Sequence, residues 1–99
     1  MDTQKIIDEK EEIIKEIDKV TKEYIKKNVE YKKAKNSAWL DTDFKDVLNS
    51  NRPTVDEKKA YVSSQTIDLR EERDELWYQR EHLLRKLDLC DDKYMADYE

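Results

Sequence analysis

The first part of the chain carries apolar residues at alternating steps of four and three positions. The stripe consists of Ile6, Ile13, Ile17, Val20, Tyr24, Tyr31, Ala34 and Ala38, with Lys10 and Lys27 at the intervening steps. A repeat of this kind directs one face of a helix toward a neighbouring helix. Ile7 and Ile14 widen the stripe on one side. The pattern predicts one long, coiled-coil-like helix over residues 3–38.

A second long helix is predicted over residues 54–90, again from a seven-residue repeat. The repeat consists of Val55, Val62, Leu69, Leu76, Leu83 and Cys90. The positions between them are polar at first (Lys59, Thr66, Arg73, Arg80) and apolar later (Leu87, Tyr94), and Trp77 and Leu84 broaden the far end. An acidic tail over residues 91–99 is expected to fray.

The residues between the two helices, 39–53, carry the local stop and start signals. We expect a short helix over Asp43–Leu48, ended by asparagines that take positive-φ positions because the chain has no glycine. Pro53 disfavours a helical conformation at the residue before it. Thr54 and Glu57 then form a capping-box pattern, which predicts the start of the second helix.

Two long helices joined by a short connector are expected to pair antiparallel. The predicted fold class is therefore all-α, with residues 1–99 forming a single helical-hairpin domain. Its seam is expected to join Ile6, Ile7, Ile13 and Ile14 to Leu76, Leu83, Leu84 and Leu87, with Trp39 and Phe44 near Tyr61 and Val62. Ile25, Val29 and Ile67 fall off the seam, which favours dimerisation into a four-helix assembly.

Composition narrows the functional classes. The chain has 99 residues, of which 45% are charged, and a net charge of −5. The absence of glycine argues against Gly-rich phosphate loops, and a single cysteine excludes an intrachain disulfide. No stretch is long and apolar enough to suggest a membrane span, so we expect a cytoplasmic protein with no membrane partner.

The titratable residues do not suggest catalysis. His82 is the sole histidine, and no second soft ligand accompanies it for a metal site. Cys90 lies on the apolar repeat and is expected to be a small buried hydrophobe, with a redox-labile thiol or a dimer contact as alternatives. The carboxylates alternate with lysines and arginines as on solvated helix faces. We therefore predict no enzyme activity, catalytic residue, cofactor or metal.

Two surfaces could bind a partner. Residues 22–35 have a net charge of +4; Lys26, Lys27, Lys32 and Lys33 could contact nucleic acid, or the cluster could complement the helix dipole and pair with a partner helix. Arginines 70, 73, 80 and 85 are read as register-setting or interface residues. Trp39, Phe44, Arg52 and Tyr61 could form a protein-binding patch, or a small core that fixes the bend.

Residues 39–62, WLDTDFKDVLNSNRPTVDEKKAYV, resemble a stretch of small helical proteins of tailed phages and prophages of Gram-positive hosts. The resemblance rests on Trp39, Leu40, Thr42, Asp43, Phe44, Val47, Leu48, Arg52, Pro53, Thr54, Lys58, Ala60, Tyr61 and Val62. It covers about a quarter of the chain. It implies an early phage protein of the host cytoplasm, encoded among replication and recombination genes, without catalytic residues to transfer.

The leading functional hypothesis is a non-enzymatic interaction protein that binds or inhibits a replication, recombination or host-defence protein. A related possibility is that acidic residues, including Asp88, Asp91, Asp92, Asp97 and Glu99, mimic nucleic acid. The alternative is an accessory factor that binds single-stranded nucleic acid through the lysine cluster.

Overall fold

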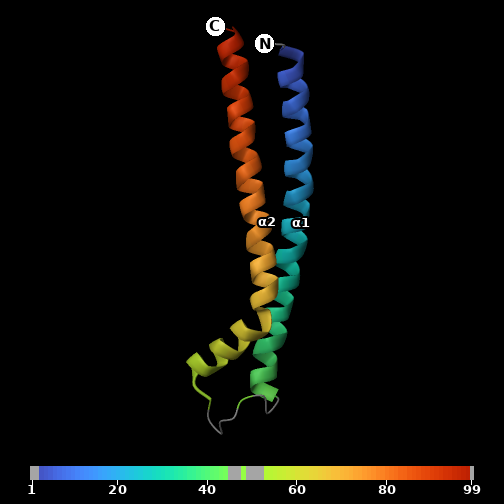
Figure 1. Ribbon diagram of the computed structural model, residues 1–99. Helices are drawn as coiled ribbons and strands as arrows, with labels where there is room; N and C mark the ends of the chain where they lie inside the picture. Colours follow the sequence, from blue (N-terminus) through green and yellow to red (C-terminus); the bar gives the residue numbers. More distant parts are fainter. Residues whose placement is uncertain (1–2, 45–47, 49–52, 99) are drawn as a thin grey trace. The chain divides into compact units, whose positions relative to one another are not determined.

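The computed structural model describes residues 3–44, 48 and 53–98, and these fold into two helices (Figure 1). α1 spans Thr3–Phe44 and α2 spans Val55–Tyr98, with no strand among the described residues. The prediction of an all-α fold built from two long helices that pack against each other is confirmed.

Both helices run further than predicted. α1 continues past residue 38 to Phe44, and Asn36 and Ser37 are ordinary helical residues within it. No described residue has a positive φ, so the backbone at Asn36 does not end the helix in an αL conformation. The start of the predicted short helix, Asp43 and Phe44, belongs to α1, whereas residues 45–47 and 49–52 lie outside the described part. Residues 91–98 are helical rather than frayed.

The start of α2 is capped as the sequence predicts. The backbone N–H of Glu57 donates to Thr54 Oγ1 over 3.1 Å, and the Thr54 hydroxyl donates to Glu57 Oε1 over 3.4 Å. The Lys58 N–H donates to the Thr54 carbonyl over 3.1 Å. Asp56 and Glu57 place negative charge in the first turn, where the helix dipole favours it. Thr54 is thus the N-cap of α2.

The chain divides into two compact units, each of which pairs a piece of α1 with a piece of α2. The first unit contains residues 1–24 and 75–99. Its core consists of Ile13, Leu83 and Cys90, against which Ile17, Val20 and Leu87 pack. Lys10 forms an ion pair with Asp91, and Arg80 Nε donates to Thr21 Oγ1 over 3.1 Å. Since later residues of α1 meet earlier residues of α2, the pairing is antiparallel.

The second unit contains residues 25–74 and is also antiparallel. Lys27 Nζ lies 2.9 Å from Glu72 Oε2, and Lys58 Nζ lies 3.0 Å from Asp43 Oδ1. Its buried residues, among those that the structure describes, are small or polar: Ala38, Thr42, Val62 and Thr66. Small side chains leave little apolar volume between the helices, so this unit has a thinner core than the first.

Arg73 and Arg80, the two arginines predicted on the seam, each form a hydrogen bond with a residue of α1 in the same unit. Arg73 Nη1 donates to Asn28 Oδ1 over 3.3 Å, and its guanidinium lies 4.5 Å from the centre of the Tyr31 ring. Arg80 contacts Thr21 and lies 5.5 Å from the centre of the Trp77 ring. A polar group that finds its partner in only one alignment fixes the register of two helices.

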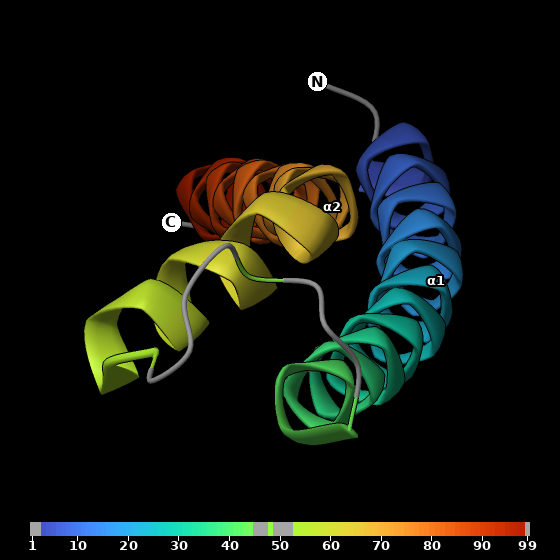
Figure 2. The same ribbon diagram turned by 90° about the horizontal axis from the view of Figure 1, so that it is seen from below.

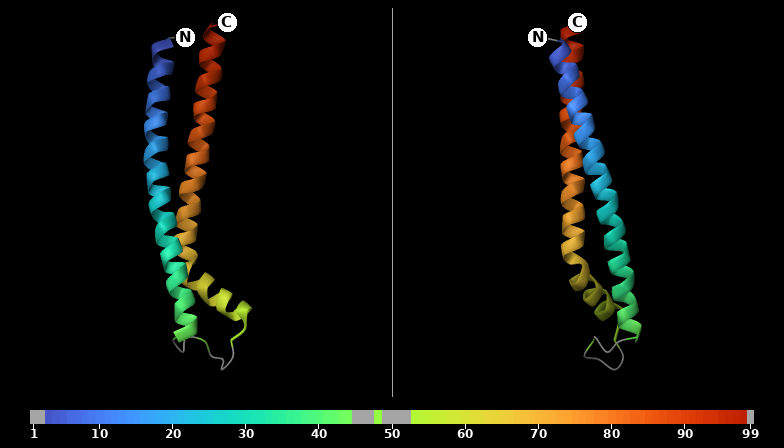
Figure 3. Two further views of the ribbon diagram at one scale, coloured as in Figure 1. Left: turned by 180° about the vertical axis from the view of Figure 1, so that it is seen from behind. Right: turned by 90° about the vertical axis from the view of Figure 1, so that its right-hand side faces the viewer.

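Within the second unit, α2 bends (Figures 1 and 3). The Ser64 hydroxyl donates to the Tyr61 carbonyl over 2.7 Å, and the Thr66 hydroxyl donates to the Val62 carbonyl over 2.8 Å. Side-chain bonds of this kind compete with main-chain bonds of the helix and favour bending. As a result, the first turns of α2 (yellow-green) lie apart from the end of α1 (green), as Figure 2 shows from below.

Burial corrects part of the predicted seam. Ile13 is buried, at 7% exposure, whereas Ile14 is 47% exposed and does not widen the seam. Val55, predicted as the first position of the second repeat, is exposed as well, because it lies in the turns that diverge from α1. Ile25, Val29 and Ile67 are exposed, in agreement with their predicted positions off the seam.

Replacing Thr54 by Ala is expected to destabilise the chain by about 1 kcal/mol, because the first turn of α2 loses its side-chain acceptor. Urea unfolding followed by circular dichroism measures the change. Thr54→Asn is the matched control, since Asn caps helices as well as Thr does. Equal stability of Thr54→Ala and the parent chain would show that the cap contributes nothing.

Ile13 and Ile14 form a matched pair with the same side chain on neighbouring positions. Ile13→Ala is expected to lower the free energy of unfolding by about 2–5 kcal/mol, since it opens a cavity beside Leu83 and Cys90. Ile14→Ala is expected to change the stability of the monomer by less than about 0.5 kcal/mol. Thermal unfolding of both variants at a dilution where the chain is monomeric is the measurement, and similar losses would contradict the described packing.

Candidate functional site

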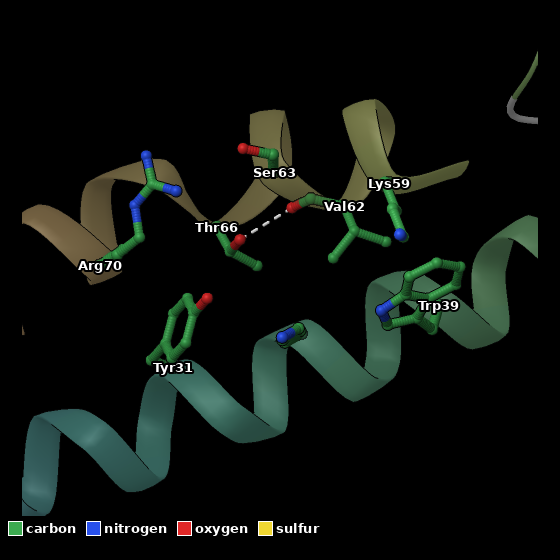
Figure 4. A pocket seen from close by; sticks show the side chains of 8 residues that line it. Tyr31, Trp39, Lys59, Val62, Ser63, Thr66 and Arg70 are labelled. Atoms are coloured by element: carbon green, nitrogen blue, oxygen red, sulfur yellow. Dashed lines mark hydrogen bonds between the residues drawn. The ribbon is translucent and has the colours of Figure 1, made fainter. Parts of the chain in front are cut away.

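The second unit contains an open pocket between α1 and α2 with a volume of about 300 Å³ (Figure 4). It lies where the first turns of α2 diverge from α1. The residues that line it are Tyr31, Lys35, Trp39, Lys59, Val62, Ser63, Thr66 and Arg70. Aromatic, basic and hydroxyl side chains thus surround one hollow.

Regular helical spacing brings these side chains together. Tyr31, Lys35 and Trp39 follow one another at four-residue steps, which places them on one stripe of α1. On α2, Lys59 and Ser63 are four residues apart, as are Thr66 and Arg70. Ser63 and Thr66 are three residues apart. The pocket is therefore formed by two facing stripes.

The floor of the pocket is held by specific contacts. Val62 and Thr66 are buried, and the hydrogen bond between the Thr66 hydroxyl and the Val62 carbonyl orients both (Figure 4). The Tyr31 ring carries the Arg73 guanidinium on one side, and its hydroxyl points toward Thr66. The Trp39 carbonyl accepts a 2.6 Å hydrogen bond from Thr42 Oγ1.

The pocket has an unbalanced positive charge. No carboxylate lines it, and among the described residues Lys35, Lys59 and Arg70 form no ion pair. Three hollows in the first unit differ, because each contains at least one glutamate beside its lysines or its histidine. Residues 25–74 also carry one more basic than acidic residue, in a chain of net charge −5. The chemistry of the pocket favours an anionic ligand.

Of the residues predicted to bind a protein partner, Trp39 lines the pocket. Tyr61 is half-buried but does not line it. Phe44 ends α1, and Arg52 lies outside the described residues. The sequence pattern did not indicate Lys59 or Ser63 as site residues, and it indicated Arg70 only as a register-setting or interface residue. Their spacing on α2 could have indicated a shared stripe, but the stripe on α1 that faces them follows only from the pairing of the helices.

The four lysines considered for nucleic-acid binding do not share one face of α1. Lys26 and Lys33 are seven residues apart and lie on the same side, whereas Lys27 and Lys32 point in other directions. Lys27 is engaged by Glu72 and Glu30, and its hydrogen bonds to these two carboxylates raise its pKa. Binding of nucleic acid by these lysines stays a prediction.

The remaining reactive groups are Cys90 and His82. Cys90 is only 2% exposed, in the core of the first unit, and burial raises the pKa of its thiol, as does the charge of Glu9. His82 is exposed and lines a shallow hollow with Glu16 and Glu23. In the described part of the chain, no three His, Cys, Asp or Glu side chains are placed to hold a metal ion.

Comparisons with models of protein families, with curated proteins and with solved structures find no match to this chain. The resemblance of residues 39–62 to small phage proteins therefore remains a prediction. Neither described helix has a stretch long and apolar enough to cross a membrane.

The buried thiol predicts a pH dependence of stability. The pKa of Cys90 is higher in the folded chain than in the unfolded chain, so unfolding favours loss of the proton. The stabilising contribution is fully present below the unfolded pKa and is lost as the pH rises through the alkaline range. In urea unfolding under reducing conditions, the parent chain should lose more stability between pH 7.5 and 10 than Cys90→Ala. Equal losses in both chains would contradict a buried thiol.

Proposed function

We propose that this chain is a non-enzymatic protein-interaction module that associates through its exposed apolar helix faces, with a second copy of itself as its first partner. The observation that carries the proposal is the imbalance between buried and exposed apolar side chains. Among the described residues of 25–74, Ala38 and Val62 are the buried apolar ones, whereas Ile25, Val29, Leu40, Val55 and Ile67 are large apolar residues left exposed.

Two of the exposed residues form a continuous stripe. Ile25 and Val29 are four residues apart on α1, so their side chains lie on one face, and they are 56% and 46% exposed. Covering a half-exposed side chain of this size contributes roughly 1 kcal/mol. In a symmetric dimer the same residue is covered on both copies, so its contribution counts twice. The sum over a few residues is comparable to the total stability of a small domain, about 3–5 kcal/mol.

A second copy suits this surface because it brings an equally incomplete pair of helices. Two copies, each of two helices, would close a four-helix assembly and shield the apolar faces that one copy leaves open. A different protein partner, such as a replication, recombination or host-defence protein, would use the same kind of helix face or the region around Trp39. The two described helices have no second apolar layer over them, and this supports association in either case.

Light scattering after size exclusion tests the self-association. The parent chain is expected to have the mass of a dimer at micromolar concentration. Val29→Lys is expected to raise the dissociation constant of the dimer at least tenfold. Gln65→Lys is the control, because Gln65 is exposed on α2 and does not belong to the stripe of Ile25 and Val29.

A monomeric mass of the parent chain up to about 100 μM would overturn self-association. A dimer that Val29→Lys and Ile25→Lys leave intact, with unchanged circular dichroism, would show that a different surface is used.

A further inference from the structure

The Trp39 side chain is a half-buried indole that packs against no other ring of the described residues. Among the described residues, the rings of Tyr24 and Trp77 pack 5.4 Å apart, and Arg80 and Arg73 lie over Trp77 and Tyr31. No described residue makes such a contact with the Trp39 ring, which lies in the pocket beside Lys35 and Lys59, and neither lysine forms an ion pair with another described residue. An open aromatic face next to positive charge is the arrangement that single-stranded nucleic acids use for stacking and for phosphate contact.

The positive charges lie on both sides of the pocket. Lys35 is contributed by α1, and Lys59 extends from α2 toward the helix that carries Trp39 (Figure 4). Arg70 extends from α2 away from α1, at the rim. Ser63 adds an exposed hydroxyl that makes no hydrogen bond to another described residue. The pocket can therefore receive a phosphate inside and a second phosphate at its rim.

We propose that this pocket binds one nucleotide of a single-stranded nucleic acid. The base stacks on Trp39, Lys35 and Lys59 hold its phosphate, and Arg70 contacts the adjacent phosphate of the strand. An acidic peptide would satisfy the cations but has no flat ring to cover the indole. A duplex does not fit, because its bases are already stacked and cannot reach Trp39.

The volume of the pocket sets the size of what it holds. About 300 Å³ is at the lower end for ligand sites, enough for one base with its phosphate, so the rest of a strand must lie outside. The proposal does not depend on self-association, since every lining residue comes from one copy of the chain. The pocket shares Tyr31 and Lys35 with the basic stretch 22–35, but the four lysines predicted there as nucleic-acid contacts, Lys26, Lys27, Lys32 and Lys33, do not line it.

Fluorescence titration tests the proposal directly. In a Trp77→Phe background, Trp39 is the sole tryptophan, and a twelve-residue oligothymidylate is expected to quench its emission at 50 mM salt. Contact with two phosphates predicts that affinity falls about 7-fold between 50 and 200 mM salt. Oligouridylate of equal length distinguishes a preference for DNA or RNA.

Variants assign the contacts. Trp39→Ala is expected to weaken binding at least tenfold, measured by anisotropy of a labelled oligonucleotide, whereas Trp39→Phe keeps a stacking surface and most of the affinity. Lys59→Gln is expected to weaken binding and to lower the salt slope by about 0.7, while Lys59→Arg retains both. Lys19→Gln is the matched control, since Lys19 lines a hollow that also contains Glu16 and Glu23.

Three outcomes would overturn the proposal. The first is no binding of the oligonucleotide at 100 μM chain and 50 mM salt. The second is binding that Trp39→Ala leaves unchanged, or that a polyglutamate or phosphorylated peptide of equal charge matches, because the site would then recognise charge alone. The third is equal binding of a duplex. Circular dichroism and light scattering on each variant separate these results from loss of fold or of self-association.

Discussion

Each of the two units depends on one apolar seam between a piece of α1 and a piece of α2, and the described residues form no second layer that covers either helix. A residue on α1 is buried only where α2 lies against it, so the seam leaves room for few side chains. In the first unit, Ile13, Leu83 and Cys90 fill it. In the second unit, small and polar residues take their place, and the bend of α2 opens the pocket beside them. The thin seam is the common origin of the exposed apolar faces and of the pocket.

Polar residues on the seam supply the specificity that so few apolar contacts cannot. Apolar repeats alone allow two helices to slide by a heptad with little loss. Arg73 finds Asn28 and the Tyr31 ring, and Arg80 finds Thr21, in the observed alignment only. Ion pairs at the surface, such as that between Lys27 and Glu72, add little stability but also favour this alignment of the helices.

Local signals in the sequence were enough to predict the two helices, the Thr54 cap and the exposed positions of Ile25, Val29 and Ile67. The end of α1 was not predictable, because Asn36 and Ser37 are compatible with a helix that is held by packing beyond them, at Ala38 and Thr42. Ile14 was misplaced because the seam is narrower than the apolar stripe. Trp39 was predicted as a binding residue and lines the pocket, but its cationic neighbours on α2 depend on the pairing of two segments far apart in sequence.

The register contacts also restrict how the length of this chain can change during evolution. One residue inserted into α1 before Asn28 would rotate every later position by about 100° and turn Tyr31 and Trp39 away from α2. A seven-residue insertion would preserve the face to within about 20°, but only if α2 gained a matching heptad. Diverged relatives should therefore differ by paired heptads in the helices or by changes between residues 44 and 55.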